Sequence, residues 1–73
     1  MMDRQELIKQ EQMLKWFAWE HLPLHLQAIS KHFGVLAETL VIDIMPGPER
    51  TVALRKLLEA KDAAVRAVVH PGG

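Results

Sequence analysis

The chain has 73 residues and no cysteine, so it corresponds to one small domain that no disulfide can stabilise. Nine basic and nine acidic residues cancel, which argues against a polymeric nucleic acid partner, and no apolar run approaches the ~20 residues that span a bilayer. Because a single core of this size is marginally stable, we expect a homo-oligomer. The lack of a bilayer-spanning run argues against a membrane partner, and the lack of cysteine fits a reducing, cytoplasmic location.

The first predicted element is an N-terminal helical arm over residues 3–19. Four apolar residues, Leu7, Ile8, Met13 and Leu14, lie among Gln, Glu and Lys, which are good helix formers. This apolar stripe is narrow, so we expect the arm to lie on another element. The charged N-terminus does not resemble a secretory signal.

The second predicted element is a helix over about residues 23–45, which begins at Pro23 because proline suits the first turn of a helix. Apolar residues recur at spacings of three or four and predict one buried face. They are Leu26, Ile29, Phe33, Leu36, Leu40 and Ile44. Further apolar residues widen this face and indicate an interface. Gly34, in the middle of the helix, indicates a close helix crossing or a bound partner.

The third predicted element is a helix over about residues 48–69. Pro46 ends the preceding helix, Pro48 suits the first position of the next, and residues 70–73 form a tail. Two long helices joined by a short turn predict an antiparallel αα-hairpin. The expected fold is therefore all-α, a hairpin with an N-terminal helical arm, in a single domain over residues 1–73.

The start of the third helix is a candidate anion site. A helix N-terminus exposes backbone N–H groups there, beside Arg50 and Thr51, and Arg55 lies one turn further on. Residues 46–73 carry five basic and three acidic residues, so an anion is expected to bind in this part of the chain. The alternative is an ordinary capped helix with solvated arginines.

Two further groups are candidates for ligand contacts. Residues 16–19 contain three of the four aromatic side chains, which either stack on nucleobases or seal a hairpin or subunit contact. Lys31 could reach a phosphate, and His21, His25 and His32 could add positive charge; the alternative is a solvated face. The chain has no cysteine nucleophile, phosphate-binding glycine loop or paired carboxylates, so neither catalysis, a metal nor a cofactor is expected.

Three stretches of the sequence resemble phage-encoded cyclic-oligonucleotide sponges of the anti-CBASS type, whose hairpin domain is shared with anti-Thoeris sponges. They cover about residues 16–68. The stretches are Pro46-x-Pro48-Glu49-Arg50-Thr51-x-Ala53-Leu54-x-Lys56-Leu57-x-Glu59-Ala60, Phe17-x-Trp19-x-His21-x-Pro23 and Leu36-Ala37.

This resemblance implies an interlocked homo-oligomer, typically a hexamer, that sequesters cyclic di- and trinucleotides in the bacterial host and blocks its defence without catalysis. By motif position Trp19 would stack on a base, and Lys31 would hold phosphate. The family's trinucleotide pocket uses polar residues that correspond to Glu49, Arg50 and Thr51. Tyrosine is usual at the position of Trp19, and the segment after Pro23 is shorter than the family pattern.

Two other functions are compatible with the same residues. A small helical hairpin could dock on another protein through its broad apolar face, which makes an interaction module the main alternative. A DNA-binding helix-turn-helix is less well supported, because it would require a basic recognition helix and the third helix is nearly charge-balanced.

Overall fold

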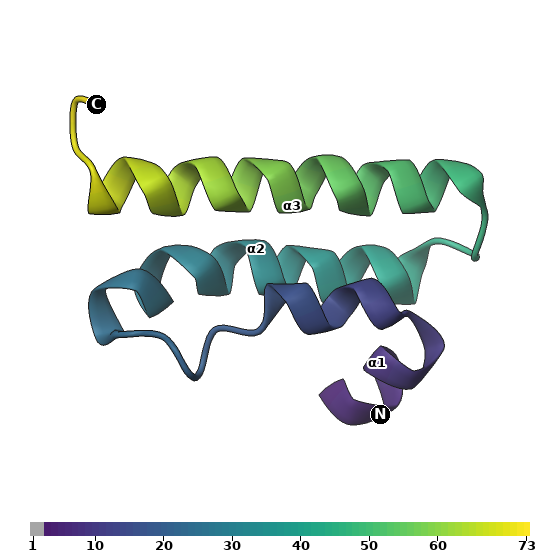
Figure 1. Ribbon diagram of the computed structural model, residues 1–73. Helices are drawn as coiled ribbons and strands as arrows, with labels where there is room; N and C mark the ends of the chain where they lie inside the picture. Colours follow the sequence, from purple (N-terminus) through teal and green to yellow (C-terminus); the bar gives the residue numbers. More distant parts are fainter. Residues whose placement is uncertain (1–2) are drawn as a thin grey trace.

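The computed structural model describes residues 3–73, and within this range the regular secondary structure is all helical, with no strand, as the sequence predicts. Its elements are α1 (Arg4–Gln10), the 3₁₀ helix η1 (Gln12–Phe17), α2 (Leu24–Asp43) and α3 (Pro48–Val69). Helices α2 and α3 lie side by side in opposite directions (Figure 1). Helix η1 packs on both of them, and α1 contacts η1 and α2.

The N-terminal arm contains two helices where the sequence predicts one. Helix α1 begins after Asp3, whose carboxylate accepts a hydrogen bond from the backbone N–H of Glu6 at 2.9 Å. At Glu11 the backbone becomes extended and α1 ends. The Glu11 carboxylate lies 2.9 Å from Nη2 of Arg50, so a contact across 39 residues accompanies the break. Helix propensity depends only on the residues of the arm itself, so it does not predict this contact or the break in the helix.

The arm is an integral part of the core. Three of the six residues in the buried apolar cluster come from it. The cluster consists of Leu7, Leu14, Phe17, Ala37, Val41 and Leu54. Each large apolar side chain buried in this way stabilises the fold by about 1.5–3 kcal/mol. The arm therefore supplies a major part of the stabilisation, and the hairpin alone would lose it.

The fully buried face of α2 is made of small residues. Ser30, Gly34, Ala37 and Val41 recur at spacings of three or four and are all buried. The face predicted from the larger apolar residues is wrong in part, because Leu36 and Ile44 are exposed. Small residues let the arm approach the α2 backbone closely. Hydrophobic periodicity identifies large apolar residues, so it does not predict a buried face made of small ones.

Helix α3 begins at Pro48, directly after the hairpin turn, as the sequence predicts. Pro48 occupies its first turn, after Gly47 as the N-cap. Thr51 donates a hydrogen bond from Oγ1 to the Gly47 carbonyl oxygen at 3.3 Å, so the first turn is closed by its own side chain. Among residues 3–73, no helix has both the length and the apolar character to cross a membrane.

Candidate functional site

Trp19 lies in the segment between η1 and α2 and is 8% exposed. Its indole packs against α2 at Gly34. An ideal Cβ on Gly34 would lie 2.9 Å from the carbonyl oxygen of Phe17 and closer still to Cε3 and Cζ3 of Trp19. The close approach that Gly34 indicates is therefore made by an aromatic ring of the same chain.

The face of the Trp19 ring is covered by Arg4. The guanidinium carbon lies 4.1 Å from the ring centroid, a stacked cation–π geometry. Two carboxylates hold the guanidinium in place: Nε donates to Oε1 of Glu38 at 2.8 Å, and Nη1 pairs with Glu20. We refer to Arg4, Trp19, Glu20 and Glu38 as the Trp19 site.

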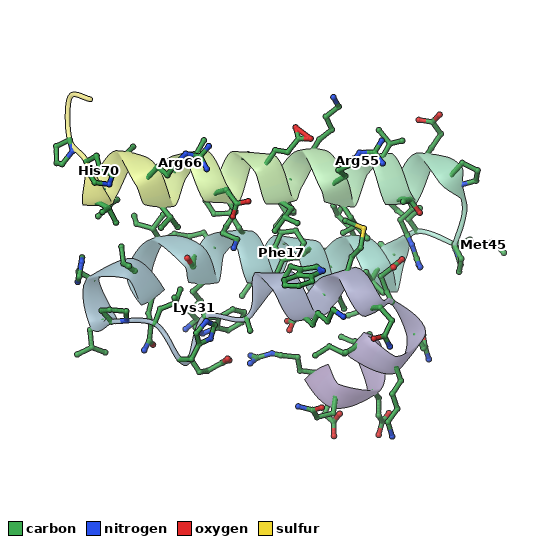
Figure 2. All side chains as sticks on the ribbon, in the orientation of Figure 1. Phe17, Lys31, Met45, Arg55, Arg66 and His70 are labelled. Carbon is green, nitrogen blue, oxygen red and sulfur yellow. The ribbon has the colours of Figure 1, made fainter. Side chains whose placement is uncertain are left out.

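Lys31 lies close to the Trp19 site along α2. It is exposed and projects from the first half of the helix (Figure 2). Lys31 precedes Gly34 by three residues and Glu38 follows Gly34 by four, so both lie one helical turn from the position where the indole packs. His21, two residues after Trp19, is exposed in the turn before α2.

Arg50 has a structural environment that the sequence does not suggest. Its side chain is 5% exposed. Nη1 donates to the carbonyl oxygens of Ile44 at 2.8 Å and Val41 at 3.3 Å, and Nη2 donates to Glu11 at 2.9 Å. The guanidinium thus caps the C-terminal carbonyls of α2 and ties the arm to the hairpin. The Arg50 guanidinium is therefore not available to an anion in solvent. The sequence alone indicates an exposed arginine at this position.

The other residues predicted at the start of α3 remain on the surface. Glu49, Thr51 and Arg55 are exposed, and Figure 2 shows Arg55 on the outer side of α3. Gly34 lies nine residues before Asp43, the end of α2. At 1.5 Å per residue, the Trp19 site is therefore roughly 14 Å along the hairpin from this group. The predicted residues therefore form two separate groups in one chain, one around Trp19 and Lys31 and one at the start of α3.

Sequence reasoning missed Arg4, Glu20 and Glu38. Arg4 is 34 residues from Glu38, and nothing in the arm marks it as more than a surface arginine. Glu38 could have been noticed because it lies one turn from Gly34, a glycine without an evident local purpose. The ring that explains Gly34 was itself among the predicted residues.

The surface also has a hollow that lies apart from the predicted residues. This hollow of about 360 Å³ at the C-terminal end of α3 is lined by Ala63, Arg66, Ala67, His70, Gly72 and Gly73; Figure 2 labels Arg66 and His70 there. None of the predicted ligand residues lines it. Within the described part of the chain, no group of three or more His, Cys, Asp or Glu side chains is placed to hold a metal ion.

Comparisons with protein-family models, curated proteins and solved structures gave no match to this chain. A functional assignment therefore depends on the geometry of the chain itself.

Proposed function

We propose that this protein is a non-enzymatic, homo-oligomeric sponge that binds cyclic di- and trinucleotide messengers in the bacterial cytoplasm and thereby blocks anti-phage immunity. The observation that carries the proposal is the placement of Trp19 and Lys31 around Gly34. A cyclic dinucleotide presents flat bases and phosphates a short distance apart. An indole and a lysine within one helical turn of the same backbone position suit both parts of such a ligand.

Access to the Trp19 ring requires Arg4 to move. The Arg4 side chain is 38% exposed, and an arginine has several rotatable bonds, so rotation away from the ring leaves the fold intact. Stacking of a base on an aromatic ring contributes ~1–3 kcal/mol, which is comparable to the ~0.5–2 kcal/mol of the cation–π contact together with the ~0–1 kcal/mol of each partly exposed ion pair of Arg4. A base can therefore compete with Arg4 for this face.

An apolar strip on the outer face of α2 supports assembly into an oligomer. Leu24, Ala28, Val35 and Ile42 are separated by four, seven and seven residues, so they share one face of the helix, and all four are exposed. Exposed apolar residues arranged in this way are typical of an interface between subunits. Lys31 lies on the same side of α2, so a second copy on the strip would also approach the Trp19 site.

Assembly also gives a role to the start of α3. Glu49, Thr51 and Arg55 are exposed, and Arg50 holds this helix start against α2 and the arm. Several copies brought together by symmetry would place several helix N-termini near one another, each favouring negative charge. We propose this group as the trinucleotide contact, with Arg50 positioning it.

The direct test is a binding measurement on the full-length protein. Purified protein is mixed with cyclic di- and trinucleotides, binding is measured by calorimetry, and the ligand is then recovered after denaturation. Saturable binding with intact ligand is expected. Degraded ligand would indicate an enzyme, and a lack of binding to every member of the panel would refute the sponge.

Variants of Lys31, Trp19 and Trp16 show whether the predicted residues bind the ligand. Lys31→Ala should weaken binding without affecting the fold, because Lys31 is exposed. Trp19→Ala should abolish it, whereas Trp16→Ala is the matched control: Trp16 is also an indole of the arm, but it is 58% exposed and lies under Lys15. Equal losses from both tryptophans would count against a stacking role for Trp19.

A protein-interaction module is the second candidate, and the apolar strip favours it. The two functions respond differently to the same variants. Under the sponge function Lys31→Ala weakens messenger binding. Under the module function it leaves partner binding intact, whereas Ile42→Lys disrupts partner binding.

A further inference from the structure

The side chain of Arg4 occupies the Trp19 site in the way that a planar, hydrogen-bonding ligand would. Its planar guanidinium stacks on Trp19 at 4.1 Å, and its N–H groups point to carboxylates on two different segments. Glu38 is the more buried partner, because its side chain is 22% exposed whereas that of Glu20 is 53% exposed. The site thus combines an aromatic face with a carboxylate at its edge.

Guanine has a pair of adjacent donors like that of a guanidinium, although Arg4 itself gives Glu38 one hydrogen bond, from Nε, and pairs with Glu20 through Nη1. The N1–H and exocyclic N2–H₂ groups of guanine belong to a planar N–C–N unit and point in the same direction. A carboxylate can accept both hydrogen bonds while the ring stacks on an indole. We propose that the Trp19 site recognises guanine, with Trp19 stacking on the base and Glu38 accepting from N1–H and N2–H₂, after Arg4 has been displaced. This inference rests on the proposed nucleotide-binding function and adds the identity of the base.

The other bases do not fit an ionised carboxylate at this position. Adenine presents an acceptor, N1, beside its amino group, so one carboxylate oxygen would face a lone pair. Uracil presents one N–H between two carbonyl oxygens and meets the same repulsion. A buried polar site discriminates strongly when the wrong ligand leaves its groups unpaired. The site therefore favours guanine over adenine and uracil.

Arg4 is a competitor for this site within the chain. Both the guanidinium and the base require the same ring face and the same oxygen of Glu38. Binding of guanine is therefore reduced by the fraction of molecules in which Arg4 occupies the site. Removal of Arg4 strengthens guanine binding and leaves the carboxylate in place.

The experiment compares cyclic di-GMP, cyclic di-AMP and cyclic di-IMP by calorimetry. Inosine lacks only the N2 amino group of guanosine, so it tests the second hydrogen bond. The native protein should bind cyclic di-GMP roughly tenfold or more tightly than either analogue. Arg4→Ala should tighten cyclic di-GMP binding by roughly threefold or more.

Glu38→Gln is the decisive variant. A glutamine amide offers one acceptor and one donor, the complement of adenine, so the preference should shift from the guanine to the adenine dinucleotide. Glu59→Gln, the same change on the exposed surface of α3, is the matched control and should leave the preference unchanged. A native protein that binds guanine and adenine dinucleotides equally, or a Glu38→Gln protein with unchanged preference, overturns the inference while the sponge function stands.

A second measurement separates the two proposals if no cyclic dinucleotide binds. GMP and AMP are titrated into the Arg4→Ala protein, and the indole N–H signal of Trp19 is followed by NMR. A shift with GMP alone supports the guanine site although the sponge function has failed. Equal shifts, or none, overturn the guanine site as well.

Discussion

The indole of Trp19 occupies the space that any side chain at Gly34 would need. This packing connects the segment before α2 to the middle of that helix. It fixes the height of the ring above the α2 backbone, and with it the distance between the ring, Glu38 and Lys31.

Gly34→Ala should lower stability by about 1–3 kcal/mol, although alanine favours an isolated helix by up to ~1 kcal/mol. The added Cβ would overlap ring atoms of Trp19 and crowd the backbone oxygen of Phe17, which cannot move aside freely. Thermal unfolding followed by circular dichroism measures the effect. Gly73→Ala is the control, since nothing lies within 4 Å of its Cβ position and it lies outside the helices. A Gly34→Ala protein more stable than the native one would contradict this packing.

Arg50→Ala should destabilise the fold by about 3–5 kcal/mol, because it leaves the Glu11 carboxylate and the end of α2 without their partner. Arg55→Ala, on the exposed side of the same helix, should change stability by less than about 0.5 kcal/mol. Chemical denaturation distinguishes them. If Arg50→Ala folded normally but failed to bind ligand, a direct contact with phosphate would be the better explanation.

Ser30→Ala should raise stability by up to about 1–2 kcal/mol. The Ser30 hydroxyl oxygen is buried without a hydrogen-bond partner, and alanine removes this desolvated group while filling almost the same space. Thr39→Ala is the comparison, because that exposed hydroxyl donates to the Val35 carbonyl oxygen at 3.0 Å. A lower melting temperature for Ser30→Ala would show that the hydroxyl has a partner.

Ile42→Lys should reduce the solution mass of the protein without unfolding it. Ile42 is 61% exposed on the apolar strip, so a lysine there is tolerated in a single chain but is desolvated at a subunit contact. Sedimentation equilibrium measures the mass, and circular dichroism checks the helices. Glu59→Lys provides the same new side chain on α3 and should leave the mass unchanged. A native protein that is already monomeric would refute the assembly.

The hairpin could be predicted because its signals are local. Pro23 and Pro48 mark where the long helices begin, and each acts within its own turn. The candidate site could be predicted only in part. Trp19 stands out in the sequence as one of few aromatics, but its partner Arg4 comes from a distant part of the chain. Arg50 illustrates the same difficulty, since an arginine at a helix start reads as an anion ligand until Glu11 is known to lie beside it.

Leu7, Leu14 and Phe17 are made early during synthesis, but the residues that cover them come later. Ala37 and Val41 follow Phe17 by about twenty residues or more, and Leu54, which completes the cluster, is made later still. Until then the arm has no apolar surface to rest on, and contacts of such long sequence separation slow folding. The arm of the nascent protein therefore cannot reach its packed position until α2 and the first turns of α3 have been made.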